Sequence, residues 1–334
     1  MKKNIVYIIL STTLIYPQWF NLNQEGVNRS YYISYPSNVT ESTPLIINMH
    51  GYGSNAQQQQ QYSEMDQFAH SQNIAVVYPE GLNNSWNVFT YWDGNSYDDV
   101  SFISDMIDDI SENFNIDLNR VYACGMSNGG YMSYRLACDL SSKIAAFGSV
   151  TGNFMINNEF GDCLDQGRDI PIIHFHGTAD AVVNYYPPSF DQSLTVGESI
   201  DFWRNYNDLD IEIIESFNSN VEIYSYFNES SVAKFVHYKV YGGSHDWFGS
   251  SWSINWGFNT SEELINFFLQ YELSDFINNQ LQGDINDDGF INIQDIILVI
   301  NLILNNEYND LSDLNSDEVL DVLDIIQLVN MVLN

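Results

Sequence analysis

The feature that most constrains the fold of this 334-residue chain is the run VYACGMSNGG at residues 121–130. Its first half is apolar and β-prone, and apolar residues recur with helical spacing directly after Gly130. The run therefore predicts a buried strand that turns sharply into a helix, with Ser127 at the turn. A serine in such a turn has a strained backbone, so its neighbours in Gly-x-Ser-x-Gly must lack bulky side chains.

Strands and helices are predicted to alternate over about 250 residues around this turn. Continuous apolar runs indicate strands buried on both faces of a sheet. Helices are predicted from Asp98 as N-cap, between residues 201 and 207, and from a capping box that starts at Thr260. The fold class is therefore α/β, a mostly parallel sheet with helices on both faces. The predicted strands lie at 19–35 (antiparallel), 44–50, 74–79, 121–125, 147–150, 170–175 and 235–241.

Three side chains of catalytic type, Ser127, Asp180 and His245, each follow a predicted strand. In an open parallel sheet, ligands gather outside the carboxyl ends of the strands. Serine needs an imidazole to take its proton and a carboxylate to hold that imidazole in the right tautomer. The order Ser, Asp, His is the one that α/β-hydrolases use. We therefore predict Ser127 as nucleophile, His245 as base and Asp180 as orienting acid, with His174 and His176 as core or strand-end histidines.

A tetrahedral intermediate also needs hydrogen-bond donors for its oxyanion. The backbone N–H of Asn128, directly after the nucleophile, is one candidate. The loop after the first central strand, HGYG at residues 50–53, occupies the place of the second, and we predict the N–H of Tyr52.

Seven motifs in order resemble the secreted polyhydroxybutyrate depolymerase and feruloyl esterase family, akin to carbohydrate esterase family 1. The resemblance covers about residues 22–272 and implies an α/β-hydrolase fold and serine carboxylester hydrolysis through an acyl-enzyme on Ser127. Family members usually have Trp-Pro-Gly after the catalytic histidine, where this chain has WFG at residues 247–249. The motifs are HGYG at 50–53, YPEG at 78–81, SWN at 85–87, GMSNGG at 125–130, RLAC at 135–138, HGTAD at 176–180 and GSHDW at 243–247.

Several substrates fit this resemblance. We expect removal of feruloyl or acetyl groups from polysaccharide, and the alternative within the enzyme class is an extracellular polyester depolymerase. A serine peptidase shares the serine turn, and a non-catalytic, calcium-dependent binding or scaffold protein is the alternative from another class. Trp86, Tyr91, Trp92 and Trp247 are candidates to stack on a phenolic acyl group or a sugar, or to anchor the core.

Charge and cysteines bear on partners and compartment. The formal net charge is −34, from 10 Lys and Arg against 44 Asp and Glu. Nucleic acids and anionic membrane surfaces would repel such a chain. Residues 1–18 combine a basic start with an apolar stretch, which predicts a signal peptide and a secreted protein. Cys124 is expected to be a small buried hydrophobe, which leaves Cys138 and Cys163 as a possible disulfide.

Residues 283–334 contain no Lys or Arg and hold an internal repeat, 284–295 and 313–324. Oxygen-bearing side chains recur at loop positions 1, 3, 5, 9 and 12, and position 7 offers a backbone carbonyl, the spacing that collects oxygens around Ca²⁺. An apolar helix is predicted after each loop, at 296–304 and 325–333. The candidate calcium ligands are Asp284, Asn286, Asp288, Phe290, Asn292 and Asp295 in the first loop, and Asp313, Asn315, Asp317, Val319, Asp321 and Asp324 in the second.

This repeat resembles a dockerin, a small all-α calcium-binding module that binds a cohesin. Glu318 stands where the glycine of the tight turn is expected. The resemblance implies structural calcium, no cofactor for catalysis and a cohesin-type scaffold partner, and a calcium-stabilised C-terminal cap is the alternative. The predicted organisation is a signal peptide at 1–18, an esterase domain at 19–272, a linker at 273–282 and the dockerin-like domain at 283–334.

Overall fold

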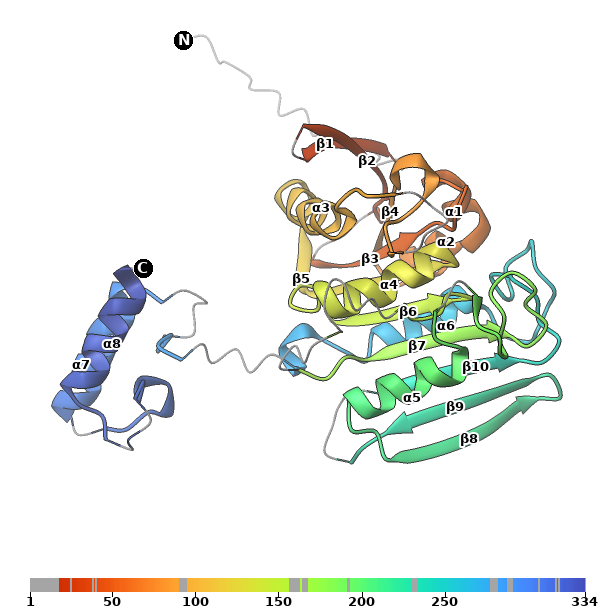
Figure 1. The fold of residues 1–334 in the computed structure, drawn as a ribbon. Coiled ribbons are helices and arrows are strands. Elements are labelled where there is room, and N and C mark those ends of the chain that lie inside the picture. Colours follow the sequence, from red (N-terminus) through yellow and green to blue (C-terminus); the bar gives the residue numbers. More distant parts are fainter. Residues whose placement is uncertain are drawn as a thin grey trace, which may run out of the picture. The chain divides into compact units, whose positions relative to one another are not determined.

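The chain forms two compact units, Met1–Phe276 and Ile277–Asn334 (Figure 1). Residues 273–276, which the sequence analysis assigns to a linker, pack on the first unit, where the ring of Phe276 lies 5.9 Å from that of Tyr271. The computed structural model describes residues 18–24, 26–37, 39, 41–89, 95–155, 163, 168–190, 193–229, 234–276, 282–286, 291–305, 307–315, 317 and 319–333.

The first unit is built on a ten-stranded sheet in the order β1-β2-β4-β3-β5-β6-β7-β10-β9-β8. The strands from β4 to β10 in this order run parallel, and antiparallel strands extend both edges. The sheet is therefore mixed and mostly parallel, as predicted for an α/β fold. The strands are β1 Gln18–Gln24, β2 Val27–Ser34, β3 Thr43–Met49, β4 Ala75–Pro79, β5 Ile116–Met126, β6 Ala146–Val150, β7 Ile172–Gly177, β8 Ile211–Asn218, β9 Val221–Phe227 and β10 Phe235–Val240.

Helices cover both faces of this sheet (Figure 1). Helices α3, α4 and α5 pack in the core on one face, and α1, α2 and α6 pack in the core on the other. Two cores on opposite faces are what a buried parallel sheet requires. The helices of this unit are α1 Ala56–Ser63, α2 Met65–Ser71, α3 Asp99–Asn113, α4 Asn128–Asp139, α5 Val196–Tyr206 and α6 Thr260–Phe268, with short 3₁₀ turns η1 Leu82–Asn84 and η3 Leu273–Asp275.

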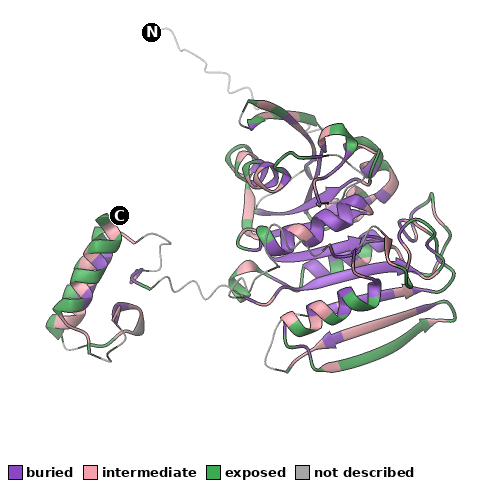
Figure 2. Ribbon diagram, viewed as in Figure 1, coloured by how far each residue is buried: buried purple, intermediate pink, exposed green. Residues whose placement is uncertain are grey.

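The central strands send alternate residues into the two cores. Leu45 and Ile47 of β3 contribute to the core beneath α3 and α4, whereas Ile46 between them contributes to the opposite core. All three side chains are fully buried, which explains why β3 reads as a continuous apolar run. Figure 2 shows that burial differs across the sheet: the central strands are buried, whereas β8 at the edge is largely exposed.

The structure confirms one predicted helix start and corrects another. Asp98 caps α3 as predicted, since its side chain accepts the Ser101 N–H. The predicted capping box at Thr260 is wrong by one residue, because Asn259 accepts the N–H groups of residues 261 and 262 and α6 begins at Thr260. The β8–β9 hairpin is absent from the predicted strands, because most of its residues are exposed or half-buried and form no continuous apolar run like those of the central strands.

The second unit contains α7 Ile293–Asn305, the 3₁₀ turn η4 Asp310–Ser312 and α8 Val322–Leu333. The two helices contact one another, and each buries one apolar residue completely, Val299 on α7 and Leu328 on α8. The predicted helices at 296–304 and 325–333 fall within α7 and α8. Asp288 and Phe290 of the first predicted calcium loop lie outside the described residues.

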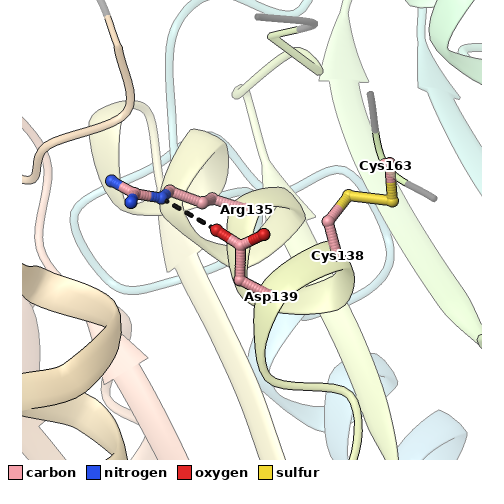
Figure 3. The surroundings of a disulfide bond; sticks show 4 residues. All are labelled: Arg135, Cys138, Asp139 and Cys163. Carbon is pink, nitrogen blue, oxygen red and sulfur yellow. Dashed lines mark hydrogen bonds and ion pairs between the residues drawn. A yellow bond between two sulfur atoms is a disulfide. The ribbon is translucent and has the colours of Figure 1, made fainter. Parts of the chain in front are cut away.

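Cys138, near the end of α4, forms a disulfide with Cys163 (Figure 3). Beside it, Arg135 and Asp139 form an ion pair of 3.2 Å. Cys124 is free and buried, in agreement with its interpretation as a small hydrophobe. The predicted signal peptide lies outside the described residues except for Gln18, the first residue of β1. None of the helices in the described ranges has the length and apolar composition needed to cross a membrane.

Candidate active site

Ser127 sits in the turn between β5 and α4 with φ 54° and ψ −119°, a conformation that L-residues rarely adopt. Its N–H donates to the carbonyl of Val150 at 2.8 Å, and its own carbonyl accepts the N–H of Tyr131 at 2.9 Å. A Cβ on Gly129 would lie 2.3 Å from the carbonyl oxygen of Met49. The absence of a side chain at Gly129 therefore lets the turn pass directly beside β3, which exposes Ser127 at the carboxyl edge of the sheet.

Asp180 and His245 meet at the same edge, from the loops after β7 and β10. The Nδ1 of His245 donates to Oδ2 of Asp180 at 2.8 Å. The other carboxylate oxygen, Oδ1, accepts the backbone N–H groups of Val182 and Val183, both at 2.8 Å. The carboxylate is thus fixed by its own loop and binds Nδ1 of the imidazole, which leaves Nε2 as the predicted base.

Asp180 is held in its ionised form. Burial alone would raise the pKa of this carboxyl group, but hydrogen bonds from His176 and His245 outweigh burial. The pKa of Asp180 therefore lies well below its ordinary value. A permanently ionised carboxylate beside Nδ1 stabilises the imidazolium that forms when His245 takes a proton.

The loop that carries His245 is fixed by its next two residues. The carboxylate of Asp246 accepts hydrogen bonds from the hydroxyls of Tyr62 and, at 2.7 Å, Ser253. Trp247 is fully buried, and its indole N–H donates to the hydroxyl of Ser261 at 3.0 Å. These contacts anchor the loop to α6 and to the end of α1.

The predicted oxyanion loop lies directly against the nucleophile. A Cβ built on Gly51 would lie 3.4 Å from Cβ of Ser127. The Nε2 of His50 accepts the N–H of Gly81 at 3.0 Å, so Nδ1 carries the hydrogen and donates to the carbonyl of Gly51 at 2.8 Å. Because a trans peptide directs C=O and N–H to opposite sides, this bond turns the N–H of Tyr52 away from His50.

His50 is suited to this structural role because it stays neutral. It is fully buried, and burial lowers its pKa to about 4 despite the hydrogen bond to Gly51. A neutral imidazole can donate from one nitrogen and accept at the other, as this geometry requires. The histidine of HGYG therefore shapes the loop rather than acting as a base.

Asn128, the other predicted oxyanion residue, is the first residue of α4, where backbone N–H groups lack partners within the helix. Its side chain pairs with the backbone of Trp86, accepting from the N–H at 2.6 Å and donating to the carbonyl at 3.1 Å. The indole N–H of Trp86 in turn donates to the carbonyl of His50 at 2.9 Å. Trp86 therefore connects the two loops that supply the predicted oxyanion donors.

A cavity of about 380 Å³ opens over the nucleophile and contains both Ser127 and His245 in its lining. Its other walls come from the oxyanion loop, α1 and the residue before Ser127. Two tyrosines contribute rings to its lining: Tyr52, a residue that is 55% exposed, and Tyr62. The complete lining is Gly51, Tyr52, Ser54, Gln58, Gln59, Tyr62, Met126, Ser127 and His245.

Trp86 and Trp247, the two described aromatic residues named from the sequence as candidates to stack on substrate, do not line this cavity. Trp86 and Trp247 are completely buried and serve as anchors of the core, and Tyr91 and Trp92 lie outside the described residues. Sequence reasoning missed Tyr62 and considered Tyr52 only for its backbone. The exposed ring of Tyr52 has one signal in the sequence, which is its position between the two glycines of HGYG.

In the described residues, which leave out Asp288 and Phe290, no group of three or more His, Cys, Asp or Glu side chains is arranged to hold a metal ion. The last acid of each loop is buried and binds backbone instead. Asp295 accepts the N–H groups of Ile285 and Asn292, both at 2.8 Å. Asp324 repeats this pattern, accepting the N–H of Leu314 and of Asp321, both at 2.9 Å.

The remaining described ligand candidates are placed as follows. Asp284 and Asp313 are buried, and Asn286, Asn292, Asn315, Asp317, Val319 and Asp321 are partly or fully exposed. In the second loop, Asp313 and Asn315 both accept the N–H of Asp317, at 3.2 and 3.0 Å. The two repeats therefore share one local geometry around their last acid.

The mixed, mostly parallel sheet, the serine turn and the Asp180–His245 pair define the class of this protein, which has the α/β-hydrolase fold. Within that class, residues 29–163 match the family model described as Esterase PHB depolymerase.

Two curated relatives illustrate the sequence similarity. A bifunctional acetylxylan esterase/xylanase of Neocallimastix patriciarum is 35% identical over 162 residues, which are 48% of this chain and 23% of the relative. Feruloyl esterase D of Neurospora crassa is 29% identical over 187 residues, 52% of this chain and 60% of the relative. The chain thus spans less than two thirds of the length of each of these relatives.

Solved structures show the same fold. An acetyl xylan esterase from Aspergillus awamori superposes with a TM-score of 0.55 at 15% identity, covering 76% of this chain and 99% of that one. A carbohydrate esterase family 1 ferulic acid esterase from Anaeromyces mucronatus gives a TM-score of 0.50 at 15% identity, covering 79% and 93%. At these identities the likeness concerns the fold alone.

Proposed function

We propose that this protein is a serine esterase that removes feruloyl or acetyl groups from polysaccharide. The observation that carries the proposal is the shared cavity of Ser127 and His245, with Asp180 bound to the far side of the imidazole. The PHB depolymerase-family segment and the relatives that act as acetylxylan or feruloyl esterases support the ester as substrate.

The geometry supports a two-step reaction. His245 Nε2 takes the hydroxyl proton of Ser127 as Oγ attacks the ester carbonyl, and the N–H groups of Tyr52 and Asn128 donate to the oxyanion. The tetrahedral intermediate collapses, the C–O bond to the alcohol breaks, and the imidazolium returns its proton to the leaving oxygen. Water, deprotonated by the same imidazole, then cleaves the acyl-enzyme and releases the acid.

The lining of the cavity supports a phenolic acyl group over acetyl. Tyr52 presents an exposed ring beside the predicted oxyanion donor, and Tyr62 adds a second ring. Aromatic faces stack on a feruloyl ring, whereas acetyl would leave most of a cavity of about 380 Å³ filled with water. Ser54 and Gln58 offer polar groups on the same wall for the ring substituents.

A substrate panel tests this proposal. The wild-type protein would be assayed on methyl ferulate, acetylated xylan, a short-chain nitrophenyl ester and a polyhydroxybutyrate suspension. We expect the highest kcat/KM on methyl ferulate, and a selective loss on that substrate in Tyr52→Ala. A higher kcat/KM on polyhydroxybutyrate than on the other esters would favour the polyester depolymerase alternative. An equal loss of kcat/KM on all esters in Tyr52→Ala would contradict the assignment of the Tyr52 ring to the acyl group.

We also propose that the second unit is a dockerin-like module that binds calcium. The repeat of oxygen-bearing residues and the recurring geometry around Asp295 and Asp324 support it. Titration of the full chain with Ca²⁺, followed by circular dichroism and calorimetry, is expected to raise the melting temperature of one of two transitions, and an unchanged thermogram after chelation would contradict it.

A cohesin-type partner is proposed for the same module. Large apolar side chains on both helices are solvent-exposed within the unit, and such side chains are typical of binding surfaces. The strongest examples are Ile293, Ile297 and Leu304 on α7, and Val322, Ile326 and Leu333 on α8, each at least 53% exposed. Charged replacements at Ile297 and Ile326 are expected to abolish calcium-dependent capture by a cohesin, and undiminished capture would contradict the assignment.

Finally, we propose that the chain is exported. The apolar N-terminal segment and the Cys138–Cys163 disulfide support this compartment, since disulfides persist where conditions are oxidising. Expression of the full chain in a bacterial host is expected to yield processed, oxidised protein outside the cytoplasm. Retention of the unprocessed chain inside the cells would contradict the proposal.

A further inference from the structure

Three histidines lie together in the sheet behind the candidate active site. His174 and His176 are on β7, His237 is on β10, and each is at most 1% exposed. The register of the two parallel strands places His237 beside His174 and Lys239 beside His176. The ring centroids of His174 lie 5.3 Å from His176 and 5.2 Å from His237. The reaction proposed above uses none of these imidazoles.

His176 is the member of this cluster that touches the candidate triad. Its Nε2 lies 2.8 Å from the carbonyl oxygen of Val183 and 3.4 Å from Oδ2 of Asp180. A carbonyl oxygen only accepts, so Nε2 carries a hydrogen and donates it to Val183, while Oδ2 of Asp180 lies on the same side of the ring at ion-pair distance. The other ring nitrogen, Nδ1, lies 3.1 Å from Nε2 of His174. The imidazole of His176 is therefore held at both ends.

The oxygen that His176 approaches is the one that binds the base. Oδ2 of Asp180 accepts from His245 Nδ1 at 2.8 Å, whereas Oδ1 is occupied by the N–H groups of Val182 and Val183. The contact with Val183 also ties the histidine to the turn that fixes Oδ1. His176 thus bears on both the position and the charge of the carboxylate.

We propose that His176 is a positioning residue of the triad, whose Nε2–H holds Oδ2 of Asp180 in line with His245 and shares the charge of that oxygen. This inference rests on the proposed esterase function. His176 contacts neither substrate nor the reacting atoms and acts only through Asp180.

Loss of the His176 contact is expected to lower kcat and to move the acid limb of the pH profile to higher pH. Without the Nε2–H, Oδ2 loses one of its two side-chain contacts, so it orients the imidazole less well and kcat falls. At the same time Oδ2 presents its undivided charge to His245, which stabilises the imidazolium and moves the acid limb of the pH profile upward. The groups that face His176 are His174 on its own strand, His237 and Lys239 on β10, Asp180 and Tyr185 in the following loop, and His245 through Asp180.

Two polar replacements separate the functions of the ring nitrogens. His176→Asn keeps an amide near the position of Nδ1 and has no atom at Nε2, whereas His176→Gln reaches the position of Nε2 with an amide N–H. His237→Asn is the matched control, because it truncates a buried imidazole of the same cluster whose Nε2 binds Tyr185 at 3.0 Å rather than Asp180.

We expect His176→Asn to lower kcat about tenfold or more with little change in KM, as loss of an outer-shell contact does elsewhere. Its acid limb is expected to rise by about half a pH unit. His176→Gln is expected to recover most of kcat and the wild-type limb, and His237→Asn to keep both. A folded His176→Asn with wild-type kcat and acid limb would overturn the proposal, as would equal effects in His176→Asn and His237→Asn.

A spectroscopic readout separates this inference from the proposed function. The proton on His245 Nδ1, hydrogen-bonded to a carboxylate, is expected to give a resolved low-field NMR resonance. We expect that resonance to shift in His176→Asn and to return in His176→Gln, whether or not an ester is turned over. A wild-type protein without esterase activity would contradict the proposed function, and an unmoved resonance in His176→Asn would contradict the role of His176.

Discussion

The two carboxylate oxygens of Asp180 have different partners. Oδ1 accepts two backbone N–H groups of its own turn, whereas Oδ2 accepts the Nδ1–H of His245 at 2.8 Å. The backbone fixes the first oxygen, so the second can hold the imidazole in a single orientation. This relationship accounts for an acidic residue that stays ionised although it is almost completely buried.

Asp180→Asn tests this arrangement with little change of volume. The Oδ1 contacts with Val182 and Val183 can persist, but an amide N–H at the other position turns Nδ1 of His245 into an acceptor. The imidazole then carries its proton on Nε2 and cannot take one from Ser127, so we expect kcat to fall by about a thousandfold or more. Steady-state hydrolysis of a nitrophenyl ester measures this loss. A decrease of less than about tenfold would show that Asp180 does not orient the base.

Trp86→Phe tests the connection between the two oxyanion loops. The change removes the indole donor from the buried carbonyl of His50, which costs about 1 to 3 kcal/mol of stability, and it loosens the loop that carries Tyr52. We therefore expect lower kcat as well as lower stability. Trp203→Phe is the matched control, because Trp203 is equally buried and its indole nitrogen has no partner within the described residues. Equal kcat values for the two variants would contradict the role of Trp86.

The buried histidines predict a loss of stability on acidification. Burial lowers the pKa of His50 to about 4 and that of His237 to about 3, where repulsion from His176 adds to burial. An unfolded histidine titrates near pH 6.5, so between that pH and the folded pKa the unfolded chain binds more protons and stability falls as pH falls. Each of the two histidines accounts for about 2 kcal/mol between about pH 7 and about pH 5.

Urea unfolding across that range measures the slope. We expect His237→Asn to lose less stability than wild type on acidification, because one of the neutral imidazoles is absent. Stability that is constant from about pH 7 to about pH 5 would mean that these histidines are not buried in their neutral form.

The disulfide predicts a redox-dependent stability. Cys138 and Cys163 are 25 residues apart, and closing a loop of that length in the unfolded chain stabilises the folded state by about 3 kcal/mol. The double replacement of both cysteines by serine is expected to lower the melting temperature accordingly, and reductant is expected to lower it in wild type and in Cys124→Ser but not in the double variant. Cys124→Ser serves as the single-cysteine control. An unaltered melting temperature in the double variant would show that the bridge contributes nothing.

Local chemistry made much of the fold predictable. The apolar runs that became β3 and β5 can only be buried on both faces, and the glycines around Ser127 leave few alternatives to a tight strand-to-helix turn. The loops that bring Asp180 and His245 to the same edge follow from parallel strands. These features depend on residues that are close in sequence or on a general property of sheets.

The other features depend on contacts that no local pattern encodes. Trp86 and Trp247 lie in motifs near the candidate site, yet both are enclosed by the core and bind His50 and Ser261. Whether a tryptophan points into a cavity or into the core is decided by packing between distant segments. The same holds for His176, whose partner Val183 could be inferred from sequence proximity but whose approach to the carboxylate could not.

The most direct test of the central claim is to trap the acyl-enzyme. Wild type and Ser127→Ala would be mixed with nitrophenyl ferulate, quenched with acid during turnover and weighed by intact-protein mass spectrometry, with peptide mapping of any adduct. We predict one feruloyl group on Ser127 in wild type and neither adduct nor turnover in Ser127→Ala. Hydrolysis by Ser127→Ala at the wild-type rate, or an adduct on another residue, would contradict the account.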